Sequence, residues 1–378
     1  MRVPERVSTT FWRAVTAWLL LYWQFSTPGR GPELPFWPHP CMRKASERPT
    51  ATVHEVARVA GVSAATVSRL LNGTAKVSDD KRQAIEQAIE RLNYKPNVLA
   101  QNLKTGSSRT VGILTQSLAS GYFADAMAGV DDALQGTGYA PLIVSGHWHA
   151  DEEAERIELL IARRVDGLVI LSGNLEDAQI LALSEQVPIV VFGRDLQGPR
   201  TYGFSLDNYR GACDAVEHLV AHGHRDIAFI AGPSDHRDAL ARLAGYRDTL
   251  AKHGIKAQRK LVLQGDFSES GGLRAVERLL ASNQRFTAIF AANDLTAYGA
   301  RLALFRRGIT VPDEVSVVGF DDLHSSMYTT PPLTTVRQPL FDVGQRLGRA
   351  ILRMIRQQPI ELEVPEPSLV VRESVRAI

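Results

Sequence analysis

From Thr110 onward, short apolar runs alternate with stretches of helical periodicity, and this alternation constrains the fold more than any other feature of the sequence. Within each run the apolar residues are nearly continuous, which is typical of strands buried on both faces of a parallel sheet. Parallel strands separated by helices predict an α/β fold, and eight strands favour two doubly wound lobes over one. The eight runs are TVGIL, APLIVSG, VDGLVIL, VPIVVFG, DIAFIAG, LVLQGD, FTAIFAAN and VSVVGFD.

Polar residues that directly follow these runs are candidate ligand contacts, because doubly wound sheets bind ligands at the carboxyl ends of their strands. Asp and Asn are also favoured helix N-caps, so for each residue taken alone a purely structural role remains open. The candidates that end or follow these runs are residues 116–123, Arg194, Asn293 with Asp294, and Asp321 with Asp322, and Asp207 with Asn208 follow the shorter stretch FSL.

Ahead of this region, residues 52–92 predict three short helices. Thr52 and Glu55 have the spacing of a capping box, which starts a helix at Val53. Gly61 interrupts that helix, Ser63 caps a second one over 64–71, and Ser78 caps a third over 79–92. The apolar side chains expected to meet in a common core are Ala57, Val62, Val67, Leu71, Ile85, Ala88, Ile89 and Leu92.

The outward face of the second predicted helix is small and hydrogen-bonding, which suits close approach to a DNA groove. Its residues are Ser63, Ala64, Ala65, Thr66, Ser68 and Arg69. A helix-turn-helix places this helix in the major groove, where Arg69 can reach a guanine or a phosphate. The pattern of helix, glycine turn and helix is by itself also compatible with an ordinary three-helix bundle. The charge supports DNA binding, since residues 42–109 contain 12 Lys and Arg against 6 Asp and Glu, whereas the residues after 109 have a net charge of −6.

The segments TVHEVARVAGVSAATVSRLLNG and KVSDDKRQAIEQAIERLNYKPNVLAQNLKTG resemble the head and hinge of the lac repressor and galactose repressor (LacI/GalR) family. This resemblance continues to near the C-terminus. It implies a sequence-specific transcription regulator, most simply a repressor of carbohydrate-utilisation genes, that binds a pseudo-palindromic operator in double-stranded DNA as a homodimer. It also implies a head over 51–96 and a hinge over 97–108, in which Leu103 wedges into the minor groove.

The DNA contacts that the resemblance implies are Thr52, Ser63, Ala64, Ala65, Thr66, Ser68, Arg69, Asn72, Tyr94, Asn97 and Leu103. Ala64 and Ala65 depart from the family pattern, because many members have polar base-reading side chains at these two positions. A methyl group can contact only a thymine methyl. The preferred operator sequence therefore stays open.

For the body, over 109–378, the resemblance implies a two-lobed fold of the type I periplasmic-binding-protein kind. The N-lobe is expected over about 109–207 and 339–366, and the C-lobe over about 208–338 and 367–378. A small effector, a sugar or alternatively a purine, would bind between the lobes, where an Arg fork with carboxylate and amide groups suits vicinal hydroxyls. The expected effector contacts are Tyr122, Phe123, Arg194, Arg242, Phe267, Asn293, Asp321 and Gln338. Phe123 and Phe267 are equally compatible with stacking on a sugar and with a place in the core.

Residues 1–50 precede the head and leave three interpretations open. Residues 14–25 are apolar, but this stretch is far shorter than the roughly 20 residues that cross a bilayer. The segment results from a mis-called start with Met42 as the true initiator, is a disordered or interaction tail, or is an export or anchoring signal, and we expect the first. The two cysteines, Cys41 and Cys213, form no CxxC pair, which favours a reducing, cytoplasmic location without a disulfide framework.

Two other classes of protein fit less well. An enzyme is not indicated, because the sequence contains no P-loop, GxSxG, HExxH or strand-linked GxGxxG motif, and no cofactor is expected. Two histidine groups, His147 with His149 and His218 with His222 and His224, have no acidic or cysteine partner in register, so we expect no metal site. A periplasmic transport receptor shares the predicted body fold, but it has no use for a helix-turn-helix.

Overall fold

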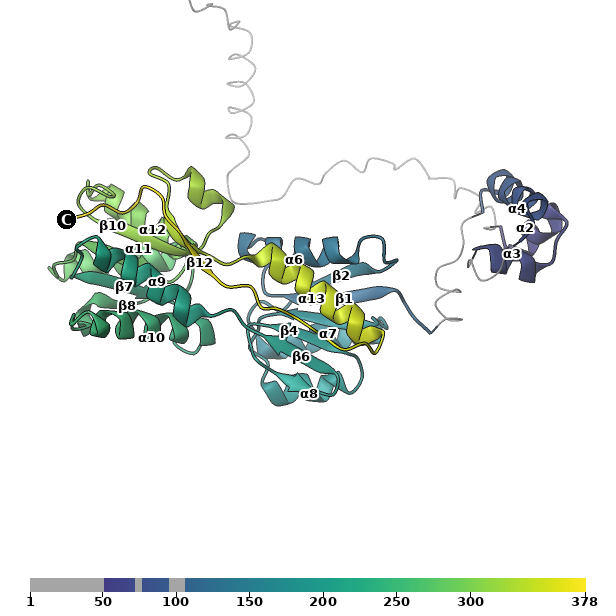
Figure 1. Ribbon diagram of the computed structural model, residues 1–378, viewed down its shortest axis with the longest axis horizontal. Helices are drawn as coiled ribbons and strands as arrows, with labels where there is room; N and C mark the ends of the chain where they lie inside the picture. The colour runs from purple at the N-terminus through teal and green to yellow at the C-terminus, as the bar shows by residue number, and fades with distance from the viewer. Residues whose placement is uncertain (1–50, 72–76, 95–105) are drawn as a thin grey trace, which may run out of the picture. The chain divides into compact units, whose positions relative to one another are not determined.

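The computed structural model describes residues 51–71, 77–94 and 106–378, which belong to two compact units (Figure 1). The first unit, within Met1–Pro96, contains the head, and the second, Asn97–Ile378, contains the body. No helix among the described residues is long and apolar enough to span a membrane.

The head consists of α2 (Val53–Ala60), α3 (Ala64–Leu71) and α4 (Asp79–Leu92), which confirms the predicted bounds. The capping box is present: the Glu55 amide donates to the Thr52 hydroxyl at 3.3 Å, and the Thr52 amide donates to the Glu55 carboxylate at 2.7 Å. Gly61 ends α2 with φ 66°, a left-handed conformation that glycine adopts without strain. Ser78 occupies the N-cap of α4, but its side chain makes no capping hydrogen bond, so that expectation was wrong.

The head has its own small core, built from the predicted side chains together with Val56. Val56, Ala57, Val67, Ile85 and Ala88 are buried, and Val62, Leu71, Ile89 and Leu92 pack against them half-buried. The apolar stripes of the three helices therefore face one another as the sequence predicts.

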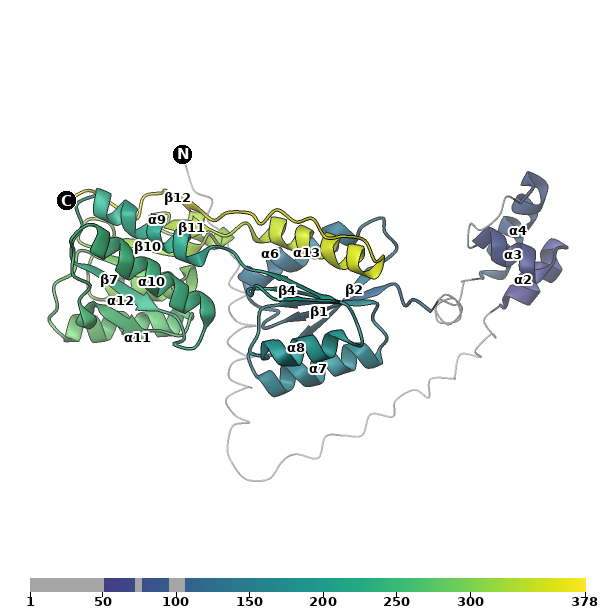
Figure 2. The same cartoon turned by 60° about the horizontal axis from the view of Figure 1, so that its bottom comes forward.

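The first sheet of the body has the strand order β2-β1-β3-β4-β6-β5 and is parallel except for β5. Helices α6 (Gly121–Leu134) and α13 (Leu340–Ile355) cover one face, and α7 (Ala150–Ala162) and α8 (Asp177–Ser184) cover the other (Figure 2). The strands are β1 (Thr110–Thr115), β2 (Ala140–Ser145), β3 (Gly167–Leu171), β4 (Ile189–Phe192), β5 (Gln197–Gly198) and β6 (Thr201–Phe204).

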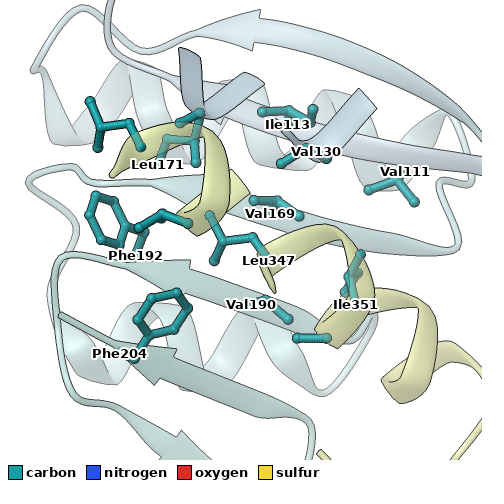
Figure 3. Close-up of a cluster of buried hydrophobic side chains, with 14 of the residues drawn as sticks. Val111, Ile113, Val130, Val169, Leu171, Val190, Phe192, Phe204, Leu347 and Ile351 are labelled. Atoms are coloured by element: carbon teal, nitrogen blue, oxygen red, sulfur yellow. The ribbon is translucent and has the colours of Figure 1, made fainter. Parts of the chain in front are cut away.

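The core between this sheet and its first helix layer draws on distant parts of the chain (Figure 3). Val169 and Val190 from the sheet meet Leu347 and Ile351 of α13 in this buried cluster. Helices α6 and α13 approach so closely that a Cβ at Gly129 would lie 2.0 Å from the Phe341 carbonyl oxygen, which requires glycine there. This close contact attaches a late helix firmly to the first lobe.

The second sheet has the order β12-β11-β10-β9-β7-β8, with only β12 antiparallel. Its strands are β7 (Ile227–Ala231), β8 (Val262–Gln264), β9 (Ala288–Ala291), β10 (Ser316–Asp321), β11 (Thr334–Arg337) and β12 (Ser368–Val370). The α-helices around it are α9 (Asn208–Ala221), α10 (Arg237–Lys252), α11 (Glu269–Ala281) and α12 (Asp294–Arg306). Two short 3₁₀ helices, η1 (Arg259–Leu261) and η2 (His324–Tyr328), complete this lobe.

The two doubly wound lobes confirm the predicted fold class, and each of the eight apolar runs contains one strand. The eight runs do not include β5, β6, β11 or β12, although the stretch FSL begins at the last residue of β6. The chain passes between the lobes after β6, after β11 and again before β12, so three segments connect them. We call the lobe of the first sheet the N-lobe and that of the second the C-lobe.

Candidate functional site

A cavity of about 270 Å³ lies between the two lobes of the body. Four strands of each sheet, β1 to β4 and β7 to β10, contribute lining residues at or after their carboxyl ends, where doubly wound sheets bind ligands. Its lining is Ser117, Ser120, Tyr122, Phe123, Trp148, Ser172, Phe192, Gly193, His236, Asp238, Arg242, Asp266, Phe267, Ser268, Asn293, Leu295, Asp321 and Leu323.

Arg242, from α10, is the only arginine or lysine of the cavity lining, and its guanidinium is held from several sides. Its side chain is only 3% exposed. Nε donates to the Asn208 side-chain oxygen at 2.9 Å, and Nη1 donates to the Ala292 carbonyl. The guanidinium carbon lies 3.8 Å from the centre of the Phe320 ring. Because packing and hydrogen bonds fix the group, it is pre-organised for bidentate binding of neighbouring oxygens.

Asp321 ends β10 beside Arg242, with 3.7 Å between Oδ1 and Nη2. Burial raises the pKa of its carboxyl group from 3.8 to about 7, and the Arg242 charge opposes that rise only in part. The Gln338 amide donates to Oδ1 at 2.7 Å, and the Tyr122 hydroxyl donates to the Gln338 oxygen at 3.4 Å. Asp321 also has φ 112°, which is rare for any residue other than glycine. The site therefore holds a carboxyl group in a strained, weakly acidic state.

Four rings form a continuous aromatic arc along the cavity, drawn from both lobes. Phe123 lies 6.1 Å from Trp148, Trp148 lies 5.4 Å from His236, and His236 lies 5.3 Å from Phe267, measured between ring centres. Burial lowers the pKa of His236. Its Nδ1 accepts from the Asp238 amide at 3.2 Å, which assigns the proton of the neutral ring to Nε2.

Asn293 lines the cavity but uses both ends of its amide within the protein. Its oxygen accepts from the Thr296 amide at 2.9 Å and so caps α12, while its nitrogen donates to the Phe267 carbonyl at 3.0 Å. The structural role that the sequence left open for this residue is therefore present. Asn293 fixes the segment that carries Phe267, which has a left-handed φ of 63°.

Six of the eight predicted effector contacts line the cavity, namely Tyr122, Phe123, Arg242, Phe267, Asn293 and Asp321. Gln338 is buried behind them, against Asp321. Arg194 does not line the cavity. Its guanidinium donates to the carbonyls of Gly173 and Leu175 at 2.6 Å each and to Asp177 at 2.9 Å, so its hydrogen-bonding capacity serves the N-lobe.

Several lining residues were not among the predicted contacts, notably Trp148, His236, Asp238 and Asp266. Each follows a predicted strand run, which is the signal that points to them. Trp148 lies in the turn after β2 with φ 62°, between the two histidines that the sequence raised only as a metal question. Within the described residues, no group of three or more His, Cys, Asp or Glu side chains is placed to hold a metal ion.

In the head, the structure places the predicted DNA contacts unevenly. Arg69 and Ala65 are exposed on α3, whereas Ala64 and Tyr94 pack half-buried against the head core, which corrects the outward position expected for Ala64. The Ser63 hydroxyl caps α3 and lies 2.9 Å from the Thr66 hydroxyl. Thr52 takes part in the capping box, and Ser68 is half-buried on α3. Asn72, Asn97 and Leu103 lie outside the described residues.

Two sequence families match the chain. The family described as bacterial regulatory proteins, lacI family, matches residues 52–97, and the periplasmic binding protein-like domain matches residues 216–375. The HTH-type transcriptional regulator GalR of Escherichia coli (strain K12) is 38% identical over 328 residues, which cover 86% of this chain and 96% of GalR. The chain belongs to the lacI family of bacterial regulatory proteins.

Solved structures agree with this assignment. The lac repressor dimer bound to operator and the anti-inducer ONPF superimposes with a TM-score of 0.78 at 31% identity, covering 87% of this chain and 100% of that one. The complex of the transcriptional regulator CelR with cellobiose gives a TM-score of 0.64 at 35% identity, covering 86% and 99%. This lacI-family protein is a helix-turn-helix transcription regulator with a ligand-binding body, and these relatives are regulators rather than enzymes.

Proposed function

We propose that this lacI-family regulator binds a neutral sugar in the interlobe cavity, and that the sugar changes its affinity for an operator in double-stranded DNA. The observation that carries the proposal is the pairing of Arg242 and Asp321 with an aromatic arc in one cavity. A sugar presents hydroxyl edges to hydrogen-bonding groups and an apolar C–H face to aromatic rings, so it would contact both the polar pair and the aromatic arc of the cavity.

The charge of the cavity favours an uncharged ligand over a sugar phosphate or a sugar acid. Three carboxyl groups, those of Asp238, Asp266 and Asp321, line it against the single guanidinium of Arg242. Asp266 is paired with Arg274 at 2.8 Å, outside the lining. An anionic ligand would therefore enter a site without surplus positive charge. The related regulator CelR, which forms a complex with cellobiose, supports the same ligand class.

A purine is the alternative effector, and it would depend on stacking. Tyr122 and Phe123 lie edge to face, with an angle of 88° between their rings, so the two cannot stack on the same side of one planar base. This arrangement favours the sugar. The related CelR complex with cellobiose also favours a sugar over a purine.

A homodimer is the assembly that we propose, with each head on one half of a pseudo-palindromic operator. An apolar surface on the C-lobe supports it: Phe305 is 79% exposed and Tyr328 is 69% exposed, with Leu302 and Met327 beside them in sequence. The Tyr298 hydroxyl lies 2.6 Å from the Ser326 hydroxyl and so joins α12 to η2. Isolated exposed apolar residues are common, but several of them on two elements joined in this way support an interface. The regulator would act in the cytoplasm, where its DNA lies.

The decisive experiment measures operator binding by fluorescence anisotropy on duplexes selected from a random library with the purified full chain. We expect a change in operator affinity on adding one or more members of a panel of neutral mono- and disaccharides, and none with hypoxanthine or sugar phosphates. A response to hypoxanthine alone would replace the sugar by a purine. Absence of any selected duplex would contradict the DNA-binding role itself.

The dimer is tested separately. Phe305→Glu places a charge at the centre of the exposed apolar surface, so sedimentation should shift from dimer to monomer. Operator affinity should fall as well, because one head then has to bind without its partner. Leu240→Glu, on the exposed side of α10, is the matched control and should leave the dimer intact. A dimer that survives Phe305→Glu would contradict this choice of interface.

A further inference from the structure

Six arginines gather at the edge of the N-lobe where its parallel strands begin, and we call this group the arginine edge. Arg109 directly precedes β1, Arg163 and Arg164 precede β3, and Arg200 precedes β6. Parallel strands start at a common edge, so these residues lie on the side of the lobe opposite the effector cavity. The complete set is Arg109, Arg163, Arg164, Arg200, Arg353 and Arg356.

Arg353 and Arg356 reach the same edge because α13 ends there. Helix α13 begins near the lobe crossing and finishes beside the start of β3, where a Cβ on Gly167 would lie 2.7 Å from Ile351 and 3.1 Å from Ile355. Figure 1 shows the end of α13 on the side of the N-lobe from which β1 starts. Arg353 lies in the last turn of the helix and Arg356 at its C-cap.

The charges of the arginine edge are not neutralised locally. All six side chains belong to exposed residues, and none makes an ion pair within the described part of the body. Arg200 donates to the Glu185 carbonyl at 2.8 Å and Arg353 to the Pro359 carbonyl at 3.3 Å, contacts that leave both charges in place. The helix dipole accounts for arginines at the ends of α7 and α13, but Arg200, between β5 and β6, follows no helix.

Acidic residues share this edge as well, and two of them are engaged. The Asp132 carboxylate accepts from the Gln345 amide at 2.6 Å, and the Asp166 carboxylate accepts from Ser108, as described below. Asp131 and Glu185 remain, and Glu361 and Glu363 line one surface pocket with Arg353 and Arg356. Two further arginines, Arg346 and Arg349, line that pocket too, so eight arginines face six acidic residues. The edge is therefore net positive, although the chain after residue 109 has a net charge of −6. A local field of opposite sign to the rest of a domain indicates an anionic partner.

Residues 107–109, which connect the hinge to β1, hold the arginine edge close to the DNA that the hinge is expected to bind. The Asp166 carboxylate accepts hydrogen bonds from the Ser107 hydroxyl, from the Ser108 amide at 2.9 Å and from the Arg109 amide at 3.0 Å. Ser107 is thus fixed to the start of β3. Leu103 precedes it by four residues, and four residues span at most about 14 Å.

We propose that the arginine edge contacts the phosphates of operator DNA beside the point at which the hinge inserts. The inference rests on the proposed function and on the Leu103 wedge that the family resemblance implies, because a Leu103 side chain between base pairs would limit Ser107 to that short distance from the duplex. An arginine side chain adds several ångströms of reach, and its guanidinium binds phosphate with little regard to base sequence. The body would then contribute affinity directly, in addition to its control of the hinge.

The salt dependence of operator binding tests the proposal, since each phosphate neutralised contributes about 0.9 to the slope of log K against log salt concentration. Two double variants of the full chain, Arg353→Gln/Arg356→Gln and Arg163→Gln/Arg164→Gln, remove exposed charges without touching a core. In at least one of them we expect the slope to fall by about 1 or more and operator affinity at low salt to fall about tenfold. Arg353→Lys/Arg356→Lys should keep the wild-type slope, because charge rather than fork geometry carries the contact.

Arg259→Gln/Lys260→Gln is the matched control, since this exposed pair lies in η1 ahead of β8 in the other lobe and its loss changes the net charge equally. It should leave the slope unchanged. A wild-type slope in both arginine double variants would overturn the proposal while leaving DNA binding by the head intact, and would redirect the search to an acidic protein partner. If the wild-type chain binds no operator, the proposed function fails first. Unchanged unfolding midpoints and sugar affinities establish that the variants remain folded.

Discussion

We predict that the buried carboxyl group of Asp321 makes effector affinity depend on pH near neutrality. Its pKa is raised to about 7 because only 5% of the side chain is exposed and burial outweighs the charge of Arg242. An ionised carboxylate accepts sugar hydroxyls, whereas the protonated group loses acceptor capacity and its attraction to Arg242. About a tenth of the groups are ionised at pH 6 and about nine tenths at pH 8, so the sugar Kd should fall about tenfold between these values.

Isothermal titration of the full chain with its sugar, in two buffers of different protonation enthalpy, measures both the affinity and the proton release. At pH 6 binding should release close to one proton, because the ligand selects the ionised carboxylate. In Asp321→Asn the pH dependence should disappear. Asp294 provides the control: burial also raises its pKa, to about 6, but Leu323, Ser326 and Thr335 hold it away from the cavity, so Asp294→Asn should keep most of the dependence.

The same pKa also predicts how stability changes with pH. Because the folded-state pKa is raised, the folded protein resists ionisation that the unfolded chain undergoes freely near pH 4. The free energy of unfolding, relative to that of Asp321→Asn, should therefore fall as the pH rises from about 4 to about 7 and level off above. An effector Kd that is constant from pH 6 to 8, or an equal slope in Asp321→Asn, would refute this reasoning.

Three further predictions concern single residues. Arg242→Lys keeps a charge but loses the fork, so the sugar Kd should rise about tenfold, equivalent to roughly 1 to 3 kcal/mol, with operator binding unchanged in the absence of sugar; a retained wild-type Kd contradicts the site. Leu103→Ala should weaken operator binding by about 2 kcal/mol through the lost wedge while random DNA is bound nearly as before, and equal losses on both would exclude the wedge. Asp166→Asn should reduce the change in operator affinity that saturating sugar causes, measured by anisotropy, while the sugar Kd stays constant; an unchanged response would show that the hinge-exit contacts carry no coupling.

Much of the fold follows from local patterns in the sequence. The head helices begin and end where the sequence predicts, because capping residues and a left-handed glycine act within a few residues of the chain. The eight buried strands are as easy to predict from the sequence as the head helices, since a strand covered on both faces has to be apolar throughout. Strands β5, β6, β11 and β12 are not among the eight runs because they lie at or near sheet edges and are short, so their residues are only partly apolar.

The site is predictable in position but not in detail. Strand ends point to the cavity, and the family resemblance selects Arg242 and Asp321 within it, yet neither reveals that Trp148 and His236 complete an aromatic arc. That arc depends on a left-handed turn at Trp148 and on how the two lobes face each other, which are properties of tertiary structure. Arg194 shows the converse case: it follows a strand as a ligand residue would, but nearby carbonyl groups take up its guanidinium.

Strand β3 connects the effector cavity with the hinge exit, and this connection gives a physical route for regulation. Ser172, directly after β3, lines the cavity, while Asp166, directly before it, holds the residues that leave the hinge. Every residue of the strand between them is buried, so it transmits a displacement of one end to the other with little local yielding. We therefore expect an effector that alters the spacing of the lobes at Ser172 to move the anchor of the hinge, and the arginine edge with it. The effector and the operator are then coupled if the effector binds the two positions of the hinge anchor with different affinities. A coupling free energy of this kind is typically about 1 to 3 kcal/mol, and it is the same for the effect of effector on DNA binding and of DNA on effector binding.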